Sequence, residues 1–401
     1  MRIVISAGAA LFLAGQADAE SVELQPIADA RLRYEHVDQA DLPRNADAVT
    51  LRVRSGLSAS AGKISALVEA QGMLAINDRY FDGLHGGASD RPLVADPQNI
   101  NLSRAQLRYQ AGGFALTAGR QNIALDDERF VGGAAFRQSI QTFDAVRTEW
   151  SRAGIKADLS YVWSVRTIWG IDGGGARQQA VSGDNFLANL AGKTPIGTLT
   201  GFAYLIDGDE AAVQGYRLSS QTYGLRLVGS HTFSPKVKLS WQGSYARQSD
   251  HHRNPNNYRA DYSLADLGLD VGPLKLGAGR EVLGADNGAP LTSFQTPLAT
   301  GFKFNGWADK FLTTPPDGLR DLYATAGYAR ALKGPVKSVS LQATWHHFES
   351  DRLVRDYGDE WNLLATAKLG RTLISARYAD YQADGFATDT RKFWLQFDWA
   401  L

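Results

Sequence analysis

The chain has 401 residues, and its 42 Lys and Arg residues balance its 42 Asp and Glu residues, so the formal net charge is zero at pH 7. This neutrality argues against a nucleic-acid partner, which selects for a basic surface. The sequence contains no Cys, which excludes disulfides and Cys-ligated metal sites. Beyond residue 19 it has no apolar run of the ~18 residues that a membrane-spanning helix needs.

Residues 1–19 predict a signal peptide. Arg2 precedes a short apolar stretch, and Ala17-Asp18-Ala19 places small residues at the spacing of a cleavage site. The alternative is an N-terminal helix of the mature fold. We expect a mature chain of residues 20–401 that leaves the cytoplasm through a bacterial inner membrane.

The mature chain is predicted to be a succession of β-strands. In residues 156–165, the large apolar side chains of Leu159, Tyr161 and Trp163 alternate with smaller or polar ones. The last ten residues, KFWLQFDWAL, repeat this alternation up to the end of the sequence. A period of two is typical of a strand with one apolar face, whereas an amphipathic helix repeats at 3.6 residues.

The connections between these stretches alternate in length. Eight short connections rich in Gly and Pro, such as Gly112-Gly113 and Gly272-Pro273, alternate with nine longer polar stretches. Transmembrane barrels alternate short periplasmic turns with long extracellular loops in this way. The sequence therefore predicts an all-β fold, a closed antiparallel β-barrel of about 18 strands in the bacterial outer membrane. Lipid surrounds its outer face, and both chain termini lie on the periplasmic side.

Alternation also predicts a lumen lined with charge, since a barrel of this size leaves a water-filled interior. Arg is much more frequent than Lys in this chain. A GC-rich genome explains this bias, as does a functional need for guanidinium groups, which hold carboxylates bidentately. The predicted lumen-facing arginines along the substrate pathway are Arg31, Arg33, Arg52, Arg54, Arg104, Arg108, Arg147 and Arg226.

Two segments share a signature, LTAGRQNIALDDERF at 116–130 and LGAGREVLGADNGAP at 276–290. Each begins in a predicted strand and runs into a long loop. We expect Arg120 and Arg280 near the extracellular mouth, with Asp126 and Asp127 close by. Two interpretations are open, an Arg–Asp pair that pins a loop and a direct contact with substrate.

The longest predicted loop, residues 281–318, is rich in aromatic and basic side chains, among them Trp307, Lys303 and Lys310. The rings either stack on sugar faces while the lysines attract carboxylates, or pack the loop into the barrel mouth as a plug or lid. Both arrangements place these residues at the mouth of the channel.

Two blocks resemble the alginate export family of outer-membrane barrels: AGRQNIALDDERFVGGAAFRQSIQTFDAVR at 118–147 and TPLATGFKFNGWADKFL at 296–312. This resemblance implies an eighteen-stranded barrel. It also implies passage of an anionic polyuronate through a lumen with an electropositive constriction, with loops and turns acting as gates.

The sequence predicts a passive channel for an anionic polysaccharide or oligosaccharide, with export as the expected direction and periplasmic delivery proteins as further partners. The alternatives are an uptake porin for small anions or sugar acids, an outer-membrane barrel enzyme, and a plugged structural barrel. We expect no enzyme, because no Gly-x-Ser-x-Gly elbow is present. No cofactor or metal is expected either, because adjacent histidines such as His346-His347 point to opposite faces of a strand.

Overall fold

The computed structural model describes residues 21–85, 89–209 and 215–401. The predicted signal peptide, residues 1–19, lies outside the described residues. The strands are β1(Glu23–Gln39), β2(Ala46–Ala61), β3(Ile64–Ala75), β4(Asn99–Ala111), β5(Phe114–Gln121), β6(Thr142–Arg152), β7(Ile155–Arg166), β8(Ala180–Thr194), β9(Gly197–Ile206), β10(Ser220–Ser234), β11(Val237–Asp250), β12(Arg259–Val271), β13(Leu274–Leu283), β14(Leu319–Ala331), β15(Val336–Glu349), β16(Asp356–Leu369), β17(Thr372–Ala383) and β18(Thr390–Ala400). The two helices are short 3₁₀ turns, η1(Tyr216–Leu218) and η2(Gly301–Lys303). Within the described ranges, no helix is long and apolar enough to cross a membrane.

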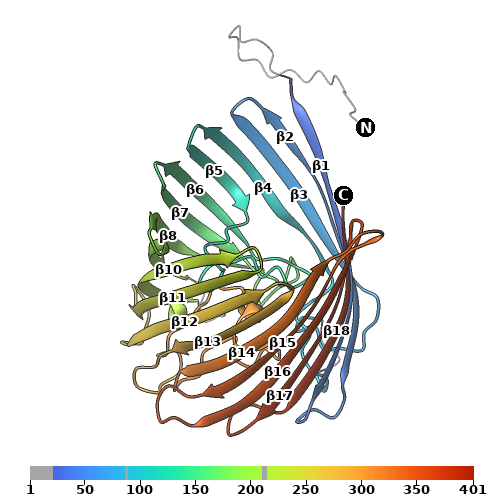
Figure 1. Cartoon of the computed structure of the whole chain (residues 1–401), viewed down its shortest axis with the longest axis vertical. Helices are drawn as coiled ribbons and strands as arrows, with labels where there is room; N and C mark the ends of the chain where they lie inside the picture. Colours follow the sequence, from blue (N-terminus) through green and yellow to red (C-terminus); the bar gives the residue numbers. More distant parts are fainter. Residues whose placement is uncertain (1–20, 86–88, 210–214) are drawn as a thin grey trace.

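The strands form one closed antiparallel ring (Figure 1). Each strand pairs with its neighbours in the sequence, and β1 pairs with both β2 and β18. At the closing seam Asp29 lies opposite Ala400, so the C-terminus lies beside β1. The predicted barrel of 18 strands is confirmed. Closure leaves no free strand edge, which the hydrocarbon of a membrane would not tolerate.

The two ends of the barrel differ, as the loop lengths predict. At one end, tight turns connect the strands, for example between Ala111 and Phe114, where Gly112 takes a positive φ of 57°. At the other end lie the longer connections, the longest being residues 284–318. In outer-membrane barrels the turn end is periplasmic and the loop end extracellular.

Alternate side chains face lipid and lumen. In β18, Trp394 is fully buried on the lumen side, whereas Phe397 and Trp399 are 37% and 40% exposed on the outer side. In β16, Asn362 is 2% exposed and its neighbour Leu363 is 44% exposed. The exposed rows are apolar because they contact hydrocarbon, and the inward rows carry the polar groups.

Two long connections fold into the barrel, residues 122–141 between β5 and β6 and residues 284–318 between β13 and β14. We call them the inner loops. They pair with each other in parallel at Val131 and Leu298, and the amide of Thr300 donates to the carbonyl of Glu128 at 3.1 Å. Their apolar side chains form a cluster with residues of the barrel wall. The lumen is therefore partly filled by protein instead of forming one open tube (Figure 1).

The opposite faces of one strand predict opposite responses to a new charge. Leu341 in β15 is 60% exposed on the lipid side, and the adjacent Gln342 faces the lumen. We expect Leu341→Arg to destabilise the folded barrel by about 2–4 kcal/mol, because it places a cation against hydrocarbon. Gln342→Arg is the matched control and should leave the unfolding free energy in lipid vesicles nearly unchanged. Equal losses in both variants would contradict the assigned faces.

Candidate functional site

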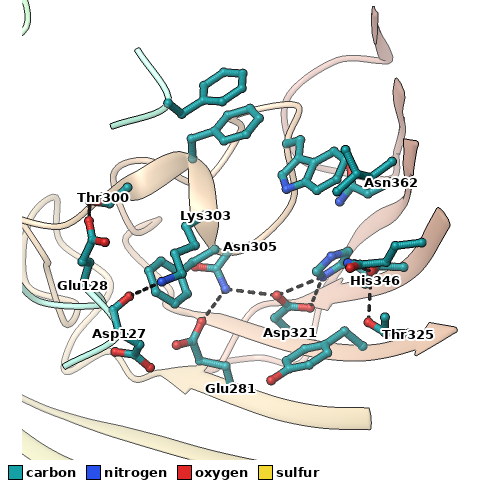
Figure 2. A pocket seen from close by; sticks show the side chains of 18 of the residues that line it. Asp127, Glu128, Glu281, Thr300, Lys303, Asn305, Asp321, Thr325, His346 and Asn362 are labelled. Atoms are coloured by element: carbon teal, nitrogen blue, oxygen red, sulfur yellow. Dashed lines mark hydrogen bonds and ion pairs between the residues drawn. The ribbon is translucent and has the colours of Figure 1, made fainter. Parts of the chain in front are cut away.

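Three cavities surround the inner loops inside the barrel. The largest, about 710 Å³, lies between the inner loops and the wall formed by β11 to β18 and β1 (Figure 2). We call it the chamber. A second cavity of about 450 Å³ lies toward the turn end, beside Arg108, Arg147 and Asp126. A third, of about 520 Å³, lies at the loop end, beside Asp309 and Lys310.

Aromatic stacking fixes the inner loops over the chamber. The rings of Phe136 and Phe302, one from each inner loop, stack with centroids 3.3 Å apart and planes 1° apart. Trp394 of β18 meets Phe136 edge-on at 5.8 Å. Trp307 stacks on Phe302 at 5.9 Å. Of the two interpretations of the longest loop, these contacts correspond to the packed one, in which the rings hold a plug in place.

Ionic contacts anchor the same loops to the wall. Asp309 accepts from Arg137 at 2.6 Å and from Lys392 of β18 at 3.2 Å, and all three side chains are buried. The backbone amide of Ala308 donates to Glu360 of β16 at 2.9 Å. Arg129 binds Glu281 of β13 at 2.7 Å. Since buried ion pairs are costly to break on one side, these contacts hold the inner loops firmly.

The environment of Asp309 preserves its charge. Burial alone would raise the pKa of this carboxyl, but the positive charges of Lys392 and Arg137 lower it below its usual value of 3.8. A carboxyl with a lowered pKa stabilises the folded state above its ordinary pKa and loses that contribution only as the pH falls through the lowered value. The anchor therefore persists throughout the neutral and mildly acidic range.

The eight arginines predicted in the lumen lie on the inward face of their strands, and each contacts a carboxylate there. Arg52 and Arg54 share Asp29 at 2.6 and 2.7 Å. The other six pairs are Arg31 with Asp398, Arg33 with Asp96, Arg104 with Glu69, Arg108 with Glu149, Arg147 with Asp158, and Arg226 with Asp127. This wall presents paired charges and not the open row of cations that the arginines alone suggest.

The signature arginines do not line the lumen. Arg120 binds Asp144 at 2.7 Å, and the two residues lie opposite each other on β5 and β6. Both side chains point outward, because the adjacent Gln121 and Phe143 are buried on the inner side. Arg280 is exposed on the outward parity of β13, because its neighbour Gly279 faces inward, where the ring of Tyr323 covers it. Adjacent residues of a strand point to opposite faces, so an inward Gly directs the following Arg outward. The contact of Arg120 corresponds to the Arg–Asp pair of the two interpretations, and a substrate contact at the mouth stays a prediction for both arginines.

The predicted mouth residues on the inner loops line the cavities. Asp127, Lys303 and Trp307 line the chamber, and the ammonium of Lys303 donates to the carbonyl of Asp127 at 2.7 Å. Asp126 lines the second cavity and accepts from Asn189 at 2.7 Å. Lys310 lines the third cavity. The structure thus distributes these residues over three separate spaces.

Arg377 of β17 differs from the other lumen arginines. It lines the chamber, and among the described residues it has no carboxylate partner within ion-pair distance. Its guanidinium donates to Ser375 at 3.2 Å and lies 5.4 Å from the ring of Phe136 and 5.9 Å from the ring of Trp307. This side chain is therefore available to bind an anion from the lumen.

Polar side chains that sequence reasoning missed complete the chamber. Figure 2 shows Asn305 hydrogen bonded to Glu281 and Asp321, at 2.6 and 3.1 Å, and Asp321 in contact with His346. Across the chamber lies Asn362, whose buried Oδ1 has no hydrogen-bond partner. The alternation of side chains along each strand would have identified these wall residues as lumen-facing. Only the folded inner loops show which of them share a cavity.

The histidines do not assemble a metal site in the parts of the chain that the structure describes, where no group of three metal-ligating side chains occurs. His346 faces inward and contacts Asp321 at 2.9 Å, whereas His347 contacts Asp359 at 3.0 Å. The two rings thus have separate partners on separate strands.

Comparison with known proteins places the chain among outer-membrane channels. Residues 23–165 match the model of the alginate export family, which confirms the resemblance. The match includes the first resembling block and one inner loop. No curated protein sequence is similar to the chain at a significant level.

Several solved barrels share the fold. OpdK of Pseudomonas aeruginosa, solved with vanillate, has 11% identity and a TM-score of 0.67 over 94% of this chain and 98% of its own. OccAB4 of Acinetobacter baumannii has 12% identity and a TM-score of 0.67 over 96% and 99%. OpdQ of P. aeruginosa has 15% identity and a TM-score of 0.61 over 94% and 98%. The family match and the shared barrel fold place the protein in the bacterial outer membrane and support a channel there.

Weakening the buried anchor should open the channel. Asp309→Asn removes the charge that holds Arg137 and Lys392, and we expect a higher single-channel conductance in planar bilayers. Asp90→Asn is the control, because it removes an ion pair with Arg44 that is solvent-exposed and therefore weak. Unchanged conductance in Asp309→Asn, with a normally folded barrel, would show that this anchor does not restrict the pore.

Lys310 predicts a pH dependence at the loop end. Burial and the neighbouring charge of Lys392 lower the pKa of Lys310 from 10.5 to about 8. Raising the pH from 7 to 9 should remove this positive charge and lower the permeability ratio of anions to cations, measured as a reversal potential. This pH-dependent change in the permeability ratio should vanish in Lys310→Gln. If it persists in that variant, another titrating group is its source.

Proposed function

We propose that the channel carries small sugar acids across the outer membrane by passive diffusion, with the carboxylate bound by Arg377 in the chamber. This corresponds to the uptake alternative, in which the concentration gradient sets the direction. The observation that supports this proposal most directly concerns the arginines that line the chamber. Among the described residues, Arg377 is the one of them that lacks a carboxylate partner. A guanidinium without such a partner can bind a carboxylate through two parallel hydrogen bonds.

The surroundings of Arg377 suit a hydroxylated acid. Trp307 presents its ring beside the guanidinium, and an aromatic face packs well against the apolar face of a sugar. Thr325 and Thr344, whose hydroxyl groups lie 3.0 Å apart, and Asn362 line the same space. These groups can exchange hydrogen bonds with the hydroxyl groups of a solute.

The size of the chamber favours a small molecule. Its volume of about 710 Å³ lies within the range of small-molecule sites. OpdK, a barrel of the same fold, was solved with vanillate, which is a small carboxylate. The stacked inner loops separate the chamber from the loop end, so a long polymer would pass only after the loops withdraw.

A second candidate is passage of an anionic polysaccharide such as a polyuronate, in the direction of export and with periplasmic delivery proteins. The match to the alginate export family over residues 23–165 favours it, since this stretch includes the inner loop 122–141. In this case the arginine pairs of the lumen would open in turn to hold successive carboxylates weakly, which lets a polymer enter and leave.

Blockade of ion current in planar bilayers separates the two candidates. Titration with D-glucuronate should block the wild-type channel, and Arg377→Gln should raise the half-blocking concentration about tenfold or more, because a hydrogen bond between charged groups is lost. Arg108→Gln is the matched control, since Arg108 faces the lumen outside the chamber. Block by long oligouronates but not by the monomer would reject the sugar-acid proposal in favour of the polymer.

A further inference from the structure

We infer that the preferred solute is an amino sugar acid, a zwitterion whose ammonium group binds the carboxylate-bearing wall of the chamber opposite Arg377. This inference rests on the proposed function and adds a second charged group to the solute. The inference follows from the arrangement of charged side chains around the chamber and from the charged groups that have no ion-pair partner.

The wall charges of the chamber are sorted by strand. β12, β13 and β14 contribute Asp266, Glu281 and Asp321, whereas β17 and β1 contribute Arg377 and Arg31. The intervening strands β15 and β16 contribute mainly uncharged polar groups. Because neighbouring strands lie side by side in the closed ring, the acidic and basic walls face the same space from different sides. A solute with two opposite charges matches this order better than a simple anion does.

Several carboxylates at the chamber already have partners. Glu281 binds Arg129 at 2.7 Å, and Asp127 binds Arg226 at 3.1 Å. Asp321 contacts His346 and Asn305. These groups belong to the internal network that holds the inner loops, and they have little capacity left for a ligand.

Two other carboxylates have no Lys or Arg partner within ion-pair distance among the described residues. Asp266 accepts only from the hydroxyl of Tyr323, at 2.8 Å, and Glu128 accepts from the hydroxyl of Thr300, at 2.5 Å. Lys303 brings a cation to this side, but its ammonium donates to a backbone carbonyl and lies 5.7 Å from the ring of Phe304. Asp266 and Glu128 therefore remain available to a cation from the lumen.

Asn362 supplies an independent sign of a missing donor. Its side chain is 2% exposed, lines the chamber, and leaves the acceptor Oδ1 without a hydrogen bond (Figure 2). A buried acceptor without a partner is unfavourable, so a donor from the solute would satisfy it. Asn362 lies on β16 beside β17, on the side of Arg377, so the matching donor is a hydroxyl group of the solute near its carboxylate.

Matched solutes test the inference in the full-length channel. 6-Amino-6-deoxy-D-gluconate differs from D-gluconate by an amino group in place of the hydroxyl at the end remote from the carboxylate, so current blockade at pH 7 isolates that group. We expect the half-blocking concentration of 6-amino-6-deoxy-D-gluconate to be about tenfold lower, because a charged donor replaces a neutral one opposite a carboxylate. Asp266→Asn combined with Glu128→Gln keeps the hydrogen-bond acceptors for Tyr323 and Thr300 but removes both charges, and it should abolish this preference. Asp158→Asn, at the lumen wall outside the chamber, should retain it.

The outcomes distinguish this inference from the proposed function. Block by D-gluconate that depends on Arg377, with no preference for 6-amino-6-deoxy-D-gluconate, would overturn the inference and leave the proposed function intact. A preference that survives the combined change of Asp266 and Glu128, with the barrel folded, would reject the acidic wall as its source. Equal block by 6-amino-6-deoxy-D-glucose, which lacks the carboxylate, would reject the zwitterion in favour of a simple cation. Absence of block by any of the acids would overturn both proposals.

Discussion

Hydrocarbon offers no hydrogen-bond partner to a peptide group, and the rest of this structure depends on that constraint. Pairing β1 with β18 satisfies the backbone around the whole ring. The same pairing imposes the alternation of side chains, since every inward residue has outward neighbours. Apolar rows such as that of Leu341 and Leu363 then meet lipid, and every charged group must lie in the lumen, at the rims, or in a pair.

A ring of 18 strands encloses more space than its own side chains fill, and this protein uses the space for two loops. The inner loops divide the lumen into separate cavities, while most wall charges pair with one another across strands, and the inner loops accept further hydrogen bonds from some of them. Arg33 shows the effect, since it is 1% exposed, binds Asp96 and Gln396, and donates to the carbonyl of Phe136. In the proposed function, solute binding therefore depends on the few groups that the internal network leaves free, above all Arg377.

The fold could be predicted from local rules. The period-two pattern of KFWLQFDWAL and the sorted lengths of the connections required only that lipid and water lie on opposite faces. Strand number, strand order and the inward direction of residues such as Arg52 followed directly. These features depend on neighbours in the sequence or on the adjacent strand, so a single sequence contains them.

The site was predicted less well because it depends on contacts between distant segments. Arg31 meets Asp398, 367 positions away, so its neutralisation was not visible in the sequence. The signature around Gly279 suggested a mouth site, but Gly279 faces inward and leaves room for the ring of Tyr323. The following residue, Arg280, therefore points outward. Asp266 and Asn362 showed no motif, because their importance arises from the space that the inner loops enclose.

The contacts of β18 link the inner loops to closure of the barrel wall. Trp394 and Lys392, which hold Phe136 and Asp309, belong to β18, the strand that closes the ring on β1. The inner loops therefore lack their final supports until that strand has joined β1. Sealing of the lumen is thereby coupled to completion of the wall, because the inner loops gain all of their supports only in the closed ring.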